Sequence, residues 1–191
     1  IRNVAADNEG VKIRVSVNFY RDEGDEYVVR AFDFTDDIAQ AVKDLGEQRY
    51  DGGGDTPEAV HTALLNAVDE HEWDENSTKL MLFVLDAPCH ENSQILQSVN
   101  SSVKLAAQKG IRIIPVVSSG ADKATEYLMR DMAIKTGGKY VFLTDHSGVS
   151  VGGHIEPTIG AYDVKKLNVL LYETISAYLD RSQVAEYTDI A

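Results

Sequence analysis

The first part of the chain alternates apolar and polar residues. Every second residue from Val11 to Phe19 is apolar, and the residues between are polar, which is the period of two of a strand with one buried face. A polar turn at 21–25 leads into a second strand-like run at 27–34. The pattern predicts an antiparallel hairpin, one strand of which forms a sheet edge.

Helical and strand patterns alternate along the rest of the chain. The apolar runs at 79–85 and 111–117 predict buried parallel strands, the first of them central and covered on both faces, and 140–143 resumes the sheet. Apolar residues at helical spacing predict helices at 35–45, from Pro57 to about residue 68, at 93–109, at 122–135 and at 163–179. This alternation predicts an α/β fold with a doubly wound, mostly parallel, Rossmann-like sheet sandwiched by helices, with one antiparallel edge strand.

The size of the chain fits one domain of 1–181 followed by a tail at 182–191. The segment 144–161, rich in Gly, Ser and His, is expected to be a long exposed loop. A formal charge of -13 argues against nucleic acid and anionic lipid as partners and favours cations or basic partners. No apolar stretch approaches the ~20 residues of a membrane helix, so no membrane insertion is expected. Cys89 is the only cysteine and excludes an intrachain disulfide.

Ligands of such sheets gather at the carboxyl ends of the strands, which draws attention to 52–59 and 85–90. The glycine-rich loop at 52–54 could cradle phosphate, but it lacks the Gly-Lys-Ser/Thr ending and carries Asp55 and Glu58 where an anion would sit. Carboxylates beside the Thr56 hydroxyl instead suit a hard cation such as Mg²⁺ or Ca²⁺. The sequence therefore favours a metal site over a phosphate site.

Two segments, Gly-Gly-Asp55-Thr56-Pro57-Glu58 and Phe83-Val84-Leu85-Asp86-Ala87, occur in this order, one before a predicted helix and one at the end of a predicted strand. Together they resemble the von Willebrand factor A and integrin I-like domains, over nearly the whole chain. Bacterial members of the family share segments similar to Tyr20-Arg21-Asp22 and Phe142-Leu143-Thr144-Asp145. The resemblance implies a metal-ion-dependent adhesion site for Mg²⁺, or Mn²⁺ or Ca²⁺. In that site Asp86 would act on the metal, often through water. Glu58 and Thr56 compete for a second position, Glu58 slightly ahead, with Asp55 beside them.

The chain departs from the family pattern in one respect. The Asp-x-Ser-x-Ser motif that begins the family's metal site is absent, which removes three of its usual ligands. By the resemblance, 11–19 matches the family's second strand, and 1–8 looks like the tail of the preceding helix. The hypothesis that follows is a native chain that begins about 30 residues earlier, roughly the length of one strand, loop and helix. Metal binding would then be weak or absent in this chain.

The leading functional hypothesis is a non-enzymatic, adhesion-type module whose metal accepts a carboxylate from a protein partner that presents an acidic residue. The resemblance slightly favours an extracytoplasmic or cell-surface location, with a cytoplasmic one as the alternative. Loop residues would form the partner-binding rim, namely Asp22, His90, Glu91, Ser118 and Asp145. One alternative is a metal-dependent hydrolase in which Asp86 and Glu58 hold the ion. Another is a metal-free scaffold domain of a larger assembly.

Simpler readings of the same residues remain open. Asp55 can cap a helix, and Asp86 can end a strand without binding anything. Cys89 beside His90 could be a nucleophile with its base, but neighbouring residues in a turn usually point apart. Ser118 with Asp145 and the following histidine could form a hydrolase-like triad, although polar loop residues at one rim explain them as well.

Overall fold

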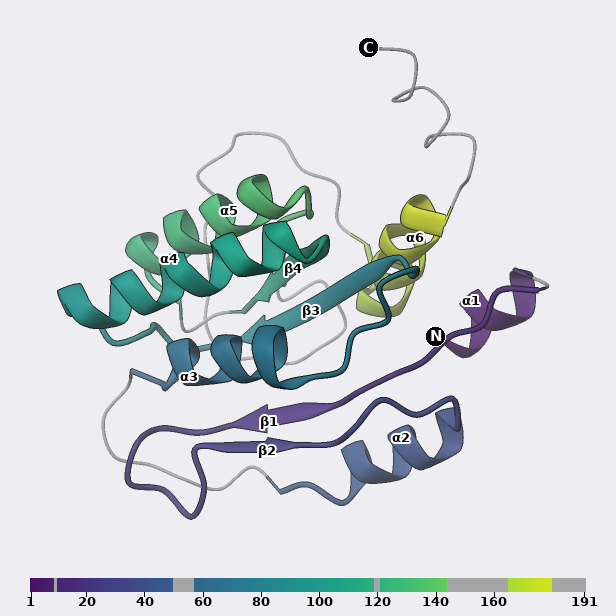
Figure 1. Ribbon diagram of the computed structural model, residues 1–191, viewed down its shortest axis with the longest axis horizontal. Helices are drawn as coiled ribbons and strands as arrows, with labels where there is room; N and C mark the ends of the chain where they lie inside the picture. Colours follow the sequence, from purple (N-terminus) through teal and green to yellow (C-terminus); the bar gives the residue numbers. More distant parts are fainter. Residues whose placement is uncertain (9, 50–56, 119–120, 144–164, 180–191) are drawn as a thin grey trace, which may run out of the picture.

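A parallel sheet forms the centre of the molecule. The computed structural model describes residues 1–8, 10–49, 57–118, 121–143 and 165–179. The sheet runs in the order β3-β4-β5, with β3 at Lys79–Leu85, β4 at Ile111–Val117 and β5 at Val141–Phe142 (Figure 1). β3 and β4 pair in register along their whole length, from Lys79 opposite Ile111 to Leu85 opposite Val117. Their carboxyl ends therefore meet at the same edge of the sheet.

Two well-capped helices make the crossovers between these strands. They are α4 at Ser93–Gln108 and α5 at Lys123–Thr136. The Asn92 side chain accepts a hydrogen bond from the Ile95 amide at 2.9 Å, and the Asp122 side chain accepts one from the Thr125 amide at 2.8 Å. Each cap satisfies an amide that has no partner inside the helix. The predictions of helices at 93–109 and 122–135 and of both long strands are confirmed. The caps and apolar patterns that predicted them act within a few residues of the chain.

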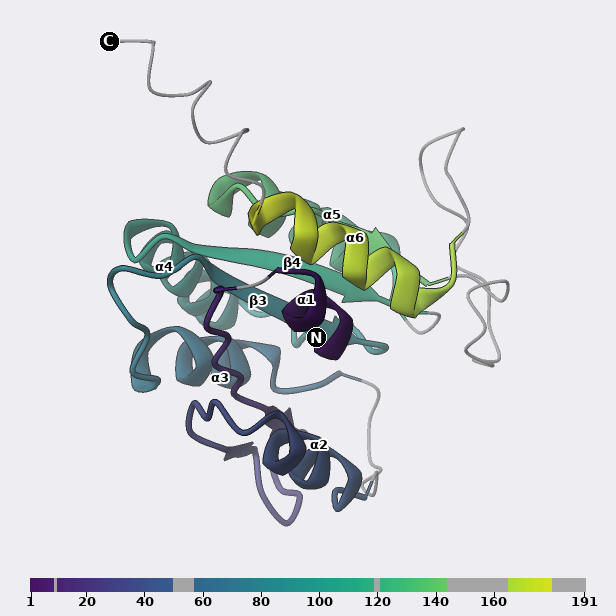
Figure 2. The ribbon, with the colours of Figure 1, turned by 90° about the vertical axis from the view of Figure 1, so that its right-hand side faces the viewer.

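Helices cover both faces of this sheet. α3 at Val60–Leu65, continued by the π-helical turn η1 at Asn66–Glu70, packs with α4 and α5 on one face. α6 at Leu167–Leu179 covers the other face, and Figure 2 shows it across β3 and β4 from α3. The side chains of β3 alternate between the two layers: Phe83 belongs to the α3 side and Leu82 to the α6 side.

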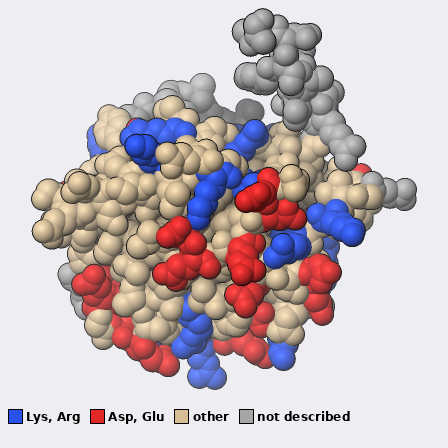
Figure 3. Space-filling model, in the orientation of Figure 1, with Lys and Arg blue, Asp and Glu red and all other residues tan. Residues whose placement is uncertain are grey.

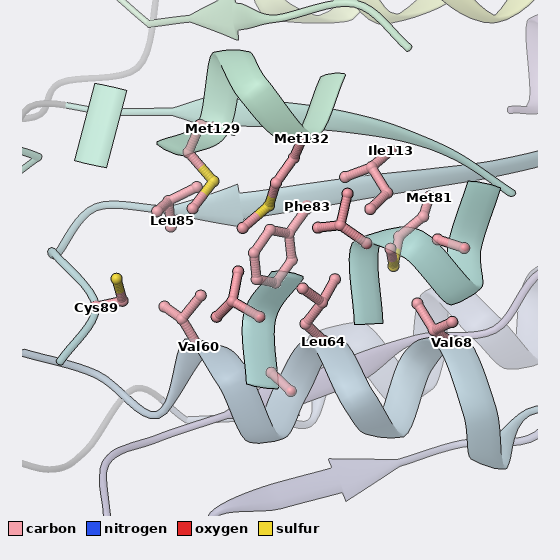
Figure 4. Close-up of a cluster of buried hydrophobic side chains, with 14 of the residues drawn as sticks. Val60, Leu64, Val68, Met81, Phe83, Leu85, Cys89, Ile113, Met129 and Met132 are labelled. Carbon is pink, nitrogen blue, oxygen red and sulfur yellow. The ribbon is translucent and has the colours of Figure 1, made fainter. Parts of the chain in front are cut away.

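The main core lies between the sheet and the helices α3, α4 and α5. Figure 4 shows Leu64 of α3 facing Phe83 of β3, with Ile113, Met129 and Met132 beyond them. Leu64, Ile113, Met129 and Met132 are fully buried. Truncating one such side chain to alanine typically costs about 2–5 kcal/mol, so this cluster fixes how α3 and α5 sit on the sheet.

A separate hairpin lies beside α3. β1 at Asn18–Tyr20 and β2 at Val29–Ala31 pair antiparallel, which confirms the predicted hairpin. α2 follows at Ile38–Gly46, where Asp37 caps the first turn, and α1 at Arg2–Asp7 precedes the hairpin. Tyr172 of α6 donates a hydrogen bond to Asp7 at 2.9 Å, which ties the first helix to the last one.

Three expectations about extents need correction. The strand at 11–19 is regular only at β1, with an isolated bridge between Val15 and Thr35, because ladder pairing requires a neighbouring strand as well as alternation. The helix expected from Pro57 begins at Val60, because Glu58 pairs with the chain beside Cys89 instead. β3 was expected to be central and covered, but in the described part of the chain its only ladder partner is β4, and Val84 is 57% exposed.

The chain is thus an α/β protein with a three-stranded parallel sheet, a two-stranded antiparallel sheet and helices. Within the described ranges, none of the helices is long and apolar enough to span a bilayer. The predicted loop at 144–161, the tail at 182–191 and the glycine run at 52–54 all lie outside the described residues.

Candidate functional site

Glu58 and Asp86 are brought to one end of the sheet by two adjoining loops. Asp86 directly follows β3 and is exposed, as expected for a residue at the carboxyl end of a strand. The Glu58 amide donates to the Pro88 carbonyl at 2.9 Å, and Glu58 and Cys89 form a parallel bridge. The loop that enters α3 is therefore fastened to the loop that leaves β3, at the left-hand end of β3 in Figure 1.

Glu58 sits in a negative environment. Partial burial raises the pKa of its carboxyl group, and the charges of Asp22, Asp25 and Asp86 raise it further, while His90 acts in the opposite direction. Its Oε2 atom is buried and has no hydrogen-bond partner among the described residues. The charges of three further carboxylates thus act on Glu58 at this end of the molecule.

The hairpin loop supplies two of these carboxylates, Asp22 and Asp25. The Asp22 Oδ1 atom lies 2.6 Å from His90 Nε2, which joins the hairpin to the loop after β3. A third acidic residue of the loop, Glu23, lies 3.8 Å from His61 of α3. Figure 3 shows acidic side chains mainly over the lower part of the molecule, where α3, the hairpin and α2 lie. The predicted rim residues Asp22 and His90 are therefore in contact with each other.

Tyr20 was not among the predicted site residues, yet it borders the same cluster. Its ring stacks on Phe83 with centroids 5.9 Å apart, and its hydroxyl donates to the Val84 carbonyl at 3.1 Å. Burial raises the pKa of Tyr20, and the charges of Asp86, Glu58 and Cys89 raise it further. The position of Tyr20 at the end of the alternating run was an available signal, because β1 ends at the same edge as β3.

The remaining predicted residues lie in different settings. Ser118 is buried at the end of β4, where its amide donates to the Leu85 carbonyl at 2.9 Å, and Glu91 is exposed. Burial raises the pKa of Cys89, which keeps it a thiol, and the short contact of the neighbouring His90 is to Asp22. The predicted residues Asp55, Thr56 and Asp145 lie outside the described part of the chain.

The described residues differ from an all-protein calcium cage. Among them there is no group of three or more His, Cys, Asp or Glu side chains placed to hold a metal ion. An all-protein cage of the calcium type therefore has no counterpart in this part of the chain. Mg²⁺ is commonly held by one or two carboxylates with water completing its shell. In that pattern, Glu58 and Asp86 are the predicted residues within the described ranges that could contribute carboxylates.

Comparison with known proteins adds one relative. No family model matches the chain. Over 160 residues the chain is 24% identical to a protein named alpha-protein kinase vwkA from Dictyostelium discoideum, a match that covers 81% of this chain and 25% of that protein. The chain thus spans about a quarter of the length of this curated relative.

The comparison corrects the expectation of a non-enzymatic protein, because the relative is named as a kinase. The predicted site residues belong to one edge of one sheet. Such residues carry no information about what the rest of a protein of that length does.

Proposed function

We propose that this chain is a von Willebrand factor A-like recognition domain that binds a divalent cation, Mg²⁺ or a similar ion, through Glu58 and Asp86. In this proposal the sheet belongs to a larger, doubly wound one. The observation that carries the proposal is the buried Oε2 atom of Glu58, which has no donor within the described part of the chain and experiences the charges of further carboxylates. A buried carboxylate oxygen without a partner is costly, and a bound cation would remove that cost.

The bound ion would supply positive charge for a carboxylate of a protein partner. Glu58 and Asp86 would hold it, with Thr56 and Asp55 as further ligands from the loop before α3. Asp22, His90 and Glu91 would surround it as the rim that the partner touches, together with Asp145, whereas Ser118 was wrongly predicted for this rim because it is buried. A charged bond inside such a rim gives affinity and selects an acidic partner.

The free edge of β3 supports the larger sheet. Among the described residues β3 pairs only with β4, although its sequence is apolar from Leu80 to Leu85. Tyr20 of β1 reaches across to Phe83 and Val84, so the hairpin stands beside that free edge without ladder pairing to it. An unpaired edge exposes backbone groups that another strand satisfies. We therefore propose that a further strand lies between β1 and β3 in the longer protein and adds cation ligands.

Titration calorimetry tests cation binding directly. Mg²⁺, Mn²⁺ and Ca²⁺ are titrated into this chain and into a longer version that carries its natural upstream segment. We expect the longer version to bind more tightly, and we expect Glu58→Gln and Asp86→Ala to weaken binding at least about tenfold, since each removes a charged ligand. Asp131→Asn is the matched control, because Asp131 lies on the surface of α5, paired with Lys135. Equal binding by all variants would refute the assignment of the ligands.

A second candidate function follows from the relative's name. A phosphotransfer activity of the longer protein would use this chain to recruit an acidic substrate protein, with the chemistry carried outside it. The experiment is an ATP-dependent phosphorylation assay on the longer protein, with and without Asp86→Ala. Loss of phosphorylation of a recruited protein, with phosphorylation of a short peptide unchanged, would support recruitment. Loss of both would place Asp86 in the catalytic machinery instead.

A further inference from the structure

The turn before β3 carries a sequence pattern that the candidate cation site does not use. Asn76-Ser77-Thr78 has the Asn-x-Ser/Thr pattern of an N-glycosylation acceptor, and Asn100-Ser101-Ser102 in α4 is a second match. A pattern this short also occurs by chance, so the match alone does not identify an acceptor. The structural setting of each asparagine decides whether a transferase can use it.

The turn before β3 is anchored at both ends and exposed between them. The Trp73 indole donates to the Ala67 carbonyl at 2.9 Å. The ammonium group of Lys79, a residue that is only 8% exposed, donates to the Glu75 carbonyl at 3.1 Å. The three residues of the pattern, 76–78, are all exposed. The anchors therefore hold the pattern at the surface of the folded chain, where an enzyme can reach it.

The two side chains that a transferase would read are free in this turn. Among the described residues, none forms a hydrogen bond with the side-chain amide of Asn76 or with the Thr78 hydroxyl. Asp74 shapes the turn through other groups: its Oδ1 atom accepts from the Asn76 backbone amide at 2.8 Å, and its carbonyl accepts from the Ser77 hydroxyl at 2.8 Å. The acceptor amide can therefore react without breaking a hydrogen bond to any described residue.

The second match lies in a setting that opposes the reaction. Asn100 Nδ2 donates to the Leu96 carbonyl at 2.9 Å, and Asn100 Oδ1 accepts from the Lys135 ammonium group at 3.3 Å. Ser102 is only 2% exposed. In a helix, residues two positions apart do not face each other, so the Asn100 amide and the Ser102 hydroxyl cannot reach one enzyme site together. The structure therefore favours the turn over the helix.

We propose that Asn76 is an N-glycosylation site, modified by an oligosaccharyltransferase in a secretory compartment. The Asn76 Nδ2 atom forms a bond to C1 of the first sugar of a lipid-linked oligosaccharide. The bond from C1 to the lipid pyrophosphate breaks, and the amide gives one proton to the transferase. The glycan stands before the amino end of β3, whereas Asp86 follows its carboxyl end, about 20 Å away along the strand. It leaves the candidate cation site open, and the proposal holds whether or not that site binds a cation.

Cell-free translation with microsomes of the endoplasmic reticulum tests the acceptor. The chain is translated behind an added signal peptide, and only chains protected from added protease are compared, so that every chain counted has met the transferase. We expect a single step in electrophoretic mobility that peptide N-glycosidase reverses. Asn76→Gln should abolish the step, and so should Thr78→Ala, which keeps the acceptor and removes only the hydroxyl of the pattern. Asn100→Gln is the matched control and should leave the step unchanged.

Peptide mapping of the protected wild-type chain covers the case in which a variant does not enter the microsomes. Mass spectrometry should find the sugar on the peptide that contains Asn76. A bare Asn76 peptide, no step in the wild-type chain, or a step that Asn100→Gln removes while Asn76→Gln does not, overturns the proposal.

Discussion

The pair Gly137 and Gly138 at the end of α5 allows a sharp test of the packing. A Cβ atom added to Gly138 would lie 1.8 Å from the Ile113 carbonyl oxygen and 2.7 Å from its carbon, distances that folded proteins do not tolerate. The obstacle is backbone of β4, which cannot rotate away as a side chain can. The end of α5 would therefore have to move away from the sheet.

The cost follows from what that movement breaks. Overpacking of a tight interior contact typically costs about 1–3 kcal/mol. The Ile113 amide also donates to Thr136 Oγ1 at 3.0 Å inside the same contact, and losing such a bond adds about 1 kcal/mol. We therefore expect Gly138→Ala to lower the free energy of unfolding by about 2–4 kcal/mol.

Gly137→Ala is the matched control. Gly137 has a φ of 65°, in the left-handed region, but an added Cβ would meet nothing within 4 Å. Its cost should be the conformational term alone, about 1 kcal/mol. Urea unfolding of both variants, followed by circular dichroism, gives the comparison. If Gly138→Ala costs no more than Gly137→Ala, the close approach of α5 to β4 is not present in the protein.

Three further predictions concern charged groups. In EDTA, without a bound metal, Glu58→Gln should raise the free energy of unfolding by about 0.5 kcal/mol, because it removes like-charge repulsion. A variant less stable than the wild-type chain in EDTA would contradict this. Backbone hydrogen bonds at the start of α5, led by the one from Thr125, lower the pKa of Asp122. The Asp122 carboxylate therefore stabilises the fold fully above the ordinary carboxyl pKa, and this stabilisation is lost as the pH falls below that value. In acid unfolding, Asp122→Asn should lose less stability than the wild-type chain, because asparagine keeps a capping side chain without a charge. Arg130→Met should lower the free energy of unfolding by about 3 kcal/mol, because Arg130 donates at 2.7 and 2.8 Å to Glu126, which is only 4% exposed. Thermal unfolding should show that adding Glu126→Gln recovers part of this loss.

Local signals in the sequence predicted much of this protein. The strand predicted at 111–117 has the same bounds as β4, and α4 and α5 begin directly after their caps, Asn92 and Asp122. Caps, glycine ends and apolar periodicity act within a few residues, so they can be found in the sequence alone. The apolar run at 79–85 likewise places Asp86 at the carboxyl end of β3.

Only the tertiary structure decided how these elements meet. The charges that act on Glu58 come partly from Asp22 and Asp25 of the hairpin, which no local pattern assigns to this edge. The hairpin strands are shorter than the alternating pattern predicted. Alternation shows which face of a strand is buried, but it does not show how far the neighbouring strand extends. The contact of Gly138 with the Ile113 backbone has the same origin. Burial, charge and close approach depend on which distant segments become neighbours, and chain folding settles this through packing of the whole core.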